Sequence, residues 1–177
     1  MSTTSELART QEWFTRVDEK QGVDVQKLAA QIAAHVEEVK EFYQALDKLV
    51  KQENEENEDG AFKQEIETLE ESRKKFASGL YNTDLKRLLI ATNDDNRAIK
   101  TELVDSLCGQ IVTATGVLSR TGFNTEEALS RVNDSNFTKF DENGDPIFNE
   151  YGKVSSDGPN YKDPDFTDLV EAAAIEK

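Results

Sequence analysis

The sequence predicts an all-α protein, a helical bundle of about 135 residues followed by an irregular C-terminal tail. Proline is absent before Pro146, and apolar residues recur at spacings of three and four through most of the preceding chain. No stretch alternates apolar and polar residues for long enough to compete as a strand. We therefore expect a helical body over residues 1–135 and a tail over residues 136–177, completing one functional site.

The amphipathic segments of the body follow one another with identifiable ends. They cover, in order, residues 5–18, 25–50, 62–80, 84–91, 95–120 and 124–132. Asp24 and Asn124 stand where N-terminal caps are expected, and the residues at 92–95 supply caps for the fifth segment. Gly122 stands where that segment should end. In the tail, Asn143 and Gly144 favour a small hairpin.

Composition restricts the classes of partner. The chain carries 36 acidic and 21 basic residues, a formal net charge of -15, which disfavours a surface for nucleic-acid phosphates and favours bound cations. The single cysteine, Cys108, excludes an intrachain disulfide and suits a reducing compartment. No apolar run approaches the ~18 residues of a membrane span, and no signal-peptide pattern is visible. We expect a cytoplasmic protein with no membrane partner.

Two acidic segments are interpreted as loops. Residues 51–60 are of low complexity and suit a solvated helix end and loop, with a calcium or protein site as the alternative. Residues 141–145 carry acids at the spacing that begins a calcium loop. However, Pro146 stands where that loop requires glycine, so we predict a turn.

Four further acids lie on unexpected faces of two helices. Glu38 and Glu41 are three residues apart, so both carboxylates project to one side, away from the main apolar stripe. An ordinary amphipathic helix would carry only polar neighbours there. The neighbours on that side are instead Ala34, Phe42, Ala45 and Leu49. The helix is therefore predicted to be buried on two faces.

The helix near residue 105 repeats this arrangement. Glu102 and Asp105 lie on one side, together with Gly109, Val112 and Gly116. Small residues let a neighbouring helix or a ligand approach closely. Buried carboxylates require a compensating cation, and an all-oxygen ligand set suits magnesium or manganese. Acidic pairs at this spacing also arise by chance on solvated faces, so the pattern alone leaves both interpretations open.

These residues resemble the motifs of a known family. HVEEVKEF at 35–42 and TELVDSL at 101–107 resemble the E-E-x-x-E and E-x-x-D motifs of the all-α nucleoside triphosphate pyrophosphohydrolases, the MazG-like superfamily. RVNDSNFTKF at 131–140 is similar to a V-x-x-S-N-x-x-K segment of the family, and residues 144–161 are similar to tails of bacteriophage-encoded members. The gap of about 60 residues between the acidic motifs exceeds the family's usual gap, so residues 51–92 are interpreted as a helical insertion.

The resemblance implies a set of site residues. The metal ligands would be Glu38, Glu41, Glu102 and Asp105. Glu37 would join them or orient the attacking water. Asn136 and Lys139 would contact the phosphates, and Ser135 would cap or contact the same group.

The resemblance also implies a reaction. A magnesium-activated water attacks the α-phosphorus of a nucleoside triphosphate, Glu38 or Glu41 accepts its proton, and Lys139 holds the departing pyrophosphate. Trp13 and Asn133 are candidates for contacts with the base. The base cannot be read from the sequence, although a phage-like member suggests a deoxynucleotide, with guanine favoured by resemblance.

A second reading is a binding protein. An acidic helical protein could mimic DNA and occupy a nucleic-acid-binding partner, provided that its acids are spread over exposed faces. The apolar neighbours of Glu38 and Glu41 argue against this as the main role. Helices that are amphipathic on two faces also predict self-association, as a homodimer or a homotetramer.

Overall fold

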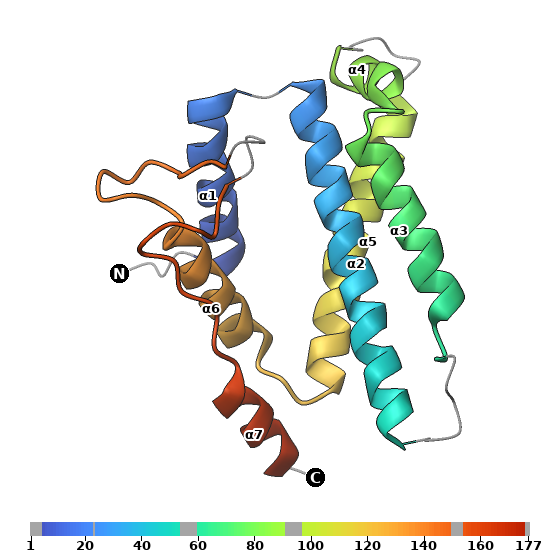
Figure 1. Ribbon diagram of the computed structural model, residues 1–177, viewed down its shortest axis with the longest axis vertical. Helices are drawn as coiled ribbons and strands as arrows, with labels where there is room; N and C mark the ends of the chain where they lie inside the picture. Colours follow the sequence, from blue (N-terminus) through green and yellow to red (C-terminus); the bar gives the residue numbers. More distant parts are fainter. Residues whose placement is uncertain (1–4, 23, 54–59, 91–96, 150–153, 176–177) are drawn as a thin grey trace. The chain divides into compact units, whose positions relative to one another are not determined.

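The computed structural model describes residues 5–22, 24–53, 60–90, 97–149 and 154–175 (Figure 1). Within these ranges it contains helices and two isolated bridges but no longer strand, so the all-α prediction is confirmed. The helices are α1 (Glu6–Gln21), α2 (Val25–Glu53), α3 (Lys63–Ala77), α4 (Asn82–Ile90), α5 (Arg97–Arg120), α6 (Thr125–Phe137) and α7 (Thr167–Ile175).

The chain divides into two compact units. Unit 1 comprises residues 1–22 and 101–177, and unit 2 comprises residues 23–100. The tail therefore belongs to the same unit as α1 and α6, and the division does not follow the expected boundary at residue 135. The expected helical insertion, 51–92, falls within unit 2.

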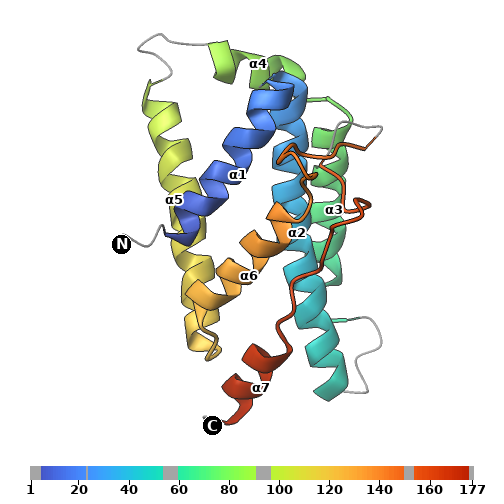
Figure 2. The same cartoon turned by 90° about the vertical axis from the view of Figure 1, so that its left-hand side faces the viewer.

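Unit 2 is built on α2, which packs against α3 and α4 (Figure 2). The cap at Asp24 is confirmed, because its carboxylate accepts a hydrogen bond of 2.9 Å from the Lys27 amide. Ala29 is buried on the main stripe, and the ring centroids of Tyr43 and Phe62 lie 5.5 Å apart. Small residues and rings on one stripe thus hold the two long helices together.

The return from α2 to α3 depends on one buried carboxylate. Asp47 Oδ1 accepts a hydrogen bond of 3.1 Å from the Phe62 amide, and Asp47 Oδ2 pairs with Lys51 at 3.1 Å. The backbone donor and the ammonium lower the pKa of Asp47. Gly60 has a φ of 80°, and a Cβ there would lie 2.5 Å from Asp47 Oδ1. Only glycine fits this approach.

Unit 1 is built on the packing of α1 against α6. Ser5 caps α1 by accepting a hydrogen bond of 3.3 Å from the Ala8 amide. The predicted cap of α6 is confirmed, since Asn124 Oδ1 accepts from the Glu127 amide at 3.1 Å. Helix α6 runs five residues beyond its predicted end, to Phe137. The residues at 133–136 therefore lie on a helix.

The tail contains the predicted hairpin and an unpredicted helix. Antiparallel bridges join Phe140 to Pro146 and Phe148 to Val154, and the residues at 141–145 form the predicted turn. Helix α7 corrects the expectation of a wholly irregular tail. Asp165 caps it, accepting hydrogen bonds from the amide and hydroxyl of Thr167 at 2.9 and 2.7 Å.

Helix α5 is largely exposed. None of its 24 residues is buried, and it packs extensively on no other described helix of unit 1. Its end at Gly122, with a φ of 87°, is the predicted one. None of the described helices is long and apolar enough to cross a membrane.

Several predicted features lie outside the described residues. They are most of the acidic run, at 54–59, the predicted caps at 92–95, and residues 150–153 of the tail. The side chains of the predicted fourth helix beyond Lys86 also lie outside the described part of the structure.

Gly60→Ala tests the return between α2 and α3. The new Cβ pays the positive-φ penalty of roughly 1–2 kcal/mol and also displaces Asp47. Gly144→Ala is the control, because Gly144 has a φ of 79° but its Cβ would come no closer than 3.9 Å to another side chain. Chemical denaturation should show a larger loss in free energy of unfolding for Gly60→Ala. Equal losses would contradict the contact with Asp47.

Candidate functional site

The first acidic pair lies on α2. The side chains of Glu38 and Glu41 are exposed, and neither makes a hydrogen bond or ion pair with any residue that the structure describes. The face beside them is apolar but uncovered within unit 2, with Phe42 44% and Leu49 59% exposed. The prediction that α2 is buried on both faces is therefore wrong for unit 2 by itself, because α3 and α4 cover only the main stripe.

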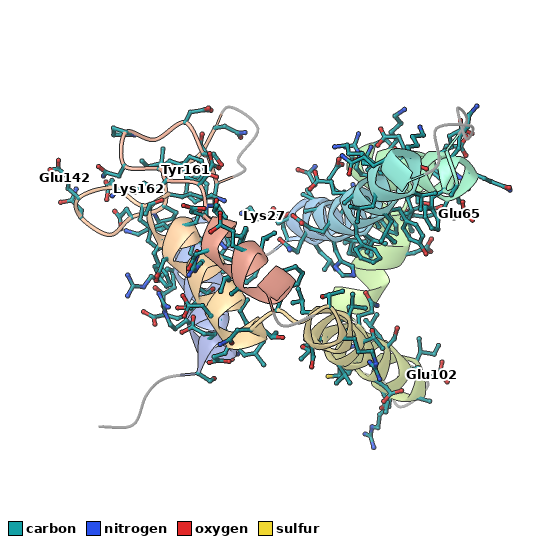
Figure 3. The ribbon with its side chains drawn as sticks, turned by 90° about the horizontal axis from the view of Figure 1, so that it is seen from below. Lys27, Glu65, Glu102, Glu142, Tyr161 and Lys162 are labelled. Carbon is teal, nitrogen blue, oxygen red and sulfur yellow. The ribbon has the colours of Figure 1, made fainter. Side chains whose placement is uncertain are left out.

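The second acidic pair lies on α5. Glu102 and Asp105 are exposed and also lack hydrogen bonds and ion pairs with the described residues, and Figure 3 shows the Glu102 side chain projecting outward. A Cβ at Gly109 would meet nothing within 4 Å. The close neighbour expected at these small residues is absent from the described part of unit 1.

The two pairs belong to different units. Glu38 and Glu41 are in unit 2, and Glu102 and Asp105 are in unit 1. Among the described residues, no three His, Cys, Asp or Glu side chains gather as a metal site. The meeting of the two pairs around one cation therefore stays a prediction.

Glu37 occupies a different environment from its neighbour Glu38. Its carboxylate pairs with Lys40 at 2.5 Å and with Arg73 at 2.6 Å, linking α2 to α3. Glu70 pairs with the same two cations at 2.9 and 2.7 Å, which lowers its pKa far below the usual range. Glu37 is thus a structural link between the helices. A role for it as a ligand or in orienting water would require it to leave two cations.

Asn133 is buried and hydrogen-bonded to α1. Its side-chain oxygen accepts a hydrogen bond of 2.9 Å from the Thr10 hydroxyl. Its amide nitrogen donates to the backbone oxygen and to the carboxylate of Glu6, both at 2.9 Å. Only 1% of Asn133 is exposed. These bonds use both amide donors and one lone pair of the oxygen, which gives Asn133 a structural role between α6 and α1, and a contact with a base would have to compete with them.

Trp13 is also used internally. Its indole Nε1 donates a hydrogen bond of 3.0 Å to the backbone oxygen of Asn136. Its ring stacks on Phe140 at 6.2 Å and meets Phe14 edge-on at 5.0 Å. The only tryptophan thus joins α1 to the end of α6 and to the hairpin.

The phosphate-contact candidates do come together, at the end of α6. Lys139 Nζ donates a hydrogen bond of 3.0 Å to Asn136 Oδ1 and lies 5.5 Å from the centroid of the Tyr161 ring. Ser135 is buried, and its hydroxyl donates to the backbone oxygen of Lys162 at 2.7 Å. The tail thus supplies neighbours for these residues, as expected.

An open pocket of about 450 Å³ lies beside this cluster. It is lined by Arg131, Asp134, Ser135, Thr138, Lys162, Asp163, Pro164 and Asp165. Figure 3 shows Tyr161 and Lys162 next to each other on the tail. Tyr161, Lys162 and Arg131 were not predicted as site residues. The similarity at 131–140 contained Arg131 and the one at 144–161 contained Tyr161, but neither assigned them a role, and no local pattern pointed to Lys162.

Arg131 fastens α7 to α6. It donates a hydrogen bond of 2.7 Å to the backbone oxygen of Asp165 and forms a two-pronged pair with the Asp168 carboxylate, one arm at 2.8 Å. Asp168 raises the pKa of Arg131, and Arg131 lowers the pKa of Asp168 to about 2. The guanidinium is thus engaged by the protein on the side that faces α7.

Comparison with protein-family models, curated proteins and solved structures finds no match to this chain.

Asn133→Ala separates a structural role from a ligand-binding one. The change removes a buried side chain and its hydrogen bonds to Thr10 and Glu6, so the free energy of unfolding should fall by about 1–3 kcal/mol without any nucleotide. Asn136→Ala, which removes a single hydrogen bond to Lys139, is the control. If denaturation shows Asn133→Ala to be no less stable than the control, the structural role is refuted.

The attachment of α7 should depend on pH. Because the pKa of Asp168 is lowered in the folded state, the pair contributes fully above the ordinary carboxyl pKa of about 4 and is lost as the pH falls towards 2. Backbone NMR shifts of Leu169 and Val170 should report this release. Asp168→Asn should show the released shifts already at neutral pH. A midpoint at the ordinary carboxyl pKa would contradict the pair.

Proposed function

We propose that this protein is a magnesium-dependent hydrolase that converts a nucleoside triphosphate to the monophosphate and pyrophosphate. The proposal rests on the environment of four exposed carboxylates on two helices, those of Glu38, Glu41, Glu102 and Asp105. Each pair has the i, i+3 spacing, sits beside apolar or small residues that are uncovered, and lacks a hydrogen-bonding or ionic partner among the described residues.

The donor set fits a hard divalent cation. All four groups are carboxylates, which suit magnesium or manganese, and two pairs on packed helices are a known way to build such a site. Apolar faces that carry unpaired carboxylates can pack together only if their charge is compensated. When bound, the cation would lower the pKa of a water and offset the charge of the triphosphate.

The protein's own residues would perform the remaining steps. Glu38 or Glu41 accepts the proton of the attacking water, whose oxygen forms a bond to the α-phosphorus as the bond to the pyrophosphate oxygen breaks. Asn136 and Lys139 would bind the phosphates, with Lys139 as a point charge. The support for these two is their pairing at 3.0 Å next in sequence to Ser135 and Thr138, which line an open pocket. Ser135 positions the tail through its bond to Lys162.

The finer assignments belong to the same proposal. The similarity to MazG-like pyrophosphohydrolases favours a deoxynucleoside triphosphate as the substrate, with guanine as the favoured base. The proposed location is the cytoplasm, which is that of a host cell if the protein is encoded by a phage. Because the side chains of Trp13 and Asn133 are hydrogen-bonded within unit 1, the proposal does not assign base recognition to them. A homodimer or homotetramer is also part of the proposal.

A DNA mimic is the second candidate. It is favoured by the net charge of -15 and by the exposed carboxylates of Glu67, Glu71 and Glu65 on α3. Glu65 is labelled in Figure 3. A mimic would release no pyrophosphate and would instead compete with DNA for a nucleic-acid-binding protein.

Glu38→Ala and Asp105→Ala test the hydrolase. With mixed deoxynucleoside triphosphates and magnesium, each should lower the rate of pyrophosphate release by at least about 100-fold, because one ligand of the cation is lost. Both side chains are exposed and make no described bonds, so helical circular dichroism and melting temperature should be retained. EDTA should abolish release by the unaltered protein.

Glu67→Ala is the matched control. Glu67 is an exposed acid on a helix, three residues from Glu70, and is not assigned to the site. It should release pyrophosphate at the unaltered rate. Equal rates for Glu38→Ala, Asp105→Ala and Glu67→Ala would overturn the proposal.

A further inference from the structure

Tyr161 is an aromatic residue of the tail whose ring lies near Lys139. The ring centroid is 5.5 Å from Lys139 Nζ, within the distance of about 6 Å at which an aromatic ring attracts a cation. Tyr161 makes no stacking or edge contact with another ring that the structure describes. Among the described residues, its ring therefore makes a specific contact with Lys139 alone.

The chain is fastened to α6 at the residue that follows Tyr161. The backbone oxygen of Lys162 accepts a hydrogen bond of 2.7 Å from the Ser135 hydroxyl, and the Lys162 amide donates to the Thr138 hydroxyl at 3.0 Å. The Thr138 hydroxyl in turn donates to the Ser135 backbone oxygen at 2.6 Å. Both polar backbone groups of Lys162 are thus bonded to side chains at the end of α6, which leads directly into Lys139.

Two further hydrogen bonds fix Tyr161 itself. Its amide donates to the Gly158 backbone oxygen at 3.1 Å, which closes a turn, and its hydroxyl donates to Asp163 Oδ1 at 2.6 Å. A Cβ at Gly158 would lie 2.9 Å from Ile147 Cδ1, so the turn packs closely on the hairpin. Because its backbone and its hydroxyl are both bonded, the ring has little freedom to turn away from Lys139.

The ring restricts the motion of a flexible cation. Lysine carries its ammonium on a four-carbon stem with many rotamers, so an unrestrained ammonium samples many positions. Asn136 Oδ1 accepts a hydrogen bond of 3.0 Å from Lys139 Nζ, and the Tyr161 ring attracts the same ammonium. Neither of these two groups carries a charge. They therefore fix the position of the ammonium without cancelling its charge.

We propose that Tyr161 is a positioning residue, which fixes the Lys139 ammonium where a phosphate group binds. This role rests on the phosphate contact proposed for Lys139. Tyr161 acts before the ligand arrives, because an ammonium that is already ordered loses less entropy on binding. The effect is limited to that of one exposed cation–π contact, which corresponds to a change in phosphate affinity of roughly 2–5-fold.

Proton NMR of the ligand-free protein tests the contact. The ring current of Tyr161 should shift the Lys139 ε-methylene protons upfield. Tyr161→Phe keeps the ring and should keep this shift, whereas Tyr161→Leu should abolish it, with helical circular dichroism unchanged in both. Lys139 protons at the ordinary lysine position in the unaltered protein, or an upfield shift that survives Tyr161→Leu, would overturn the proposal.

Binding of magnesium pyrophosphate, followed by NMR titration, tests the positioning role. Tyr161→Leu should weaken binding roughly 2–5-fold, and Lys139→Ala should weaken it at least as much. The double variant should bind no more weakly than Lys139→Ala, because Tyr161 acts only through Lys139. Tyr161→Phe is the matched control and should bind as the unaltered protein does.

Each outcome of the titration has a distinct meaning. Additive losses, an unchanged affinity in Tyr161→Leu, or equal losses in Tyr161→Leu and Tyr161→Phe would overturn the positioning role. An unaltered protein that does not bind pyrophosphate would overturn the phosphate contact of Lys139 and this role with it. The predicted pattern of affinities without pyrophosphate release from nucleoside triphosphates would overturn the hydrolase and leave the positioning role in place.

Discussion

Compensation of like charge is the constraint on which the account depends. Glu37 and Glu70 share Lys40 and Arg73, and that pairing joins α2 to α3. Glu38, one residue further along α2, has no such partner among the described residues. A chain with 36 acids and 21 bases cannot supply a cation to every carboxylate. The remaining charge must face water or a bound cation.

Helix α6 holds the elements of unit 1 together. Through Asn133 it binds α1, through Ser135 it binds the tail, and through Arg131 it binds α7. Those three contacts leave Asn136 and Lys139 at the helix end, beside Tyr161. One short helix therefore holds the groups proposed for phosphate contact in a fixed relation to each other.

Local signals predicted most of the fold. The caps at Asp24 and Asn124, the stop at Gly122 and the turn at Asn143–Gly144 depend on neighbouring residues, so they could be read from the sequence. Contacts between residues far apart in the sequence could not be predicted in this way. The burial of Asn133 depends on side chains more than 120 residues away, and the covering of only one face of α2 depends on where α3 and α4 pack.

Direct binding of manganese tests the central claim, that the two acidic pairs share one cation. Electron paramagnetic resonance would measure manganese affinity in the unaltered protein, Glu41→Gln, Glu102→Gln and the double variant. A shared site predicts that each single change weakens the same high-affinity binding and that the double change costs far less than the sum of the two. Additive losses, or affinities unchanged by either substitution, would contradict the account.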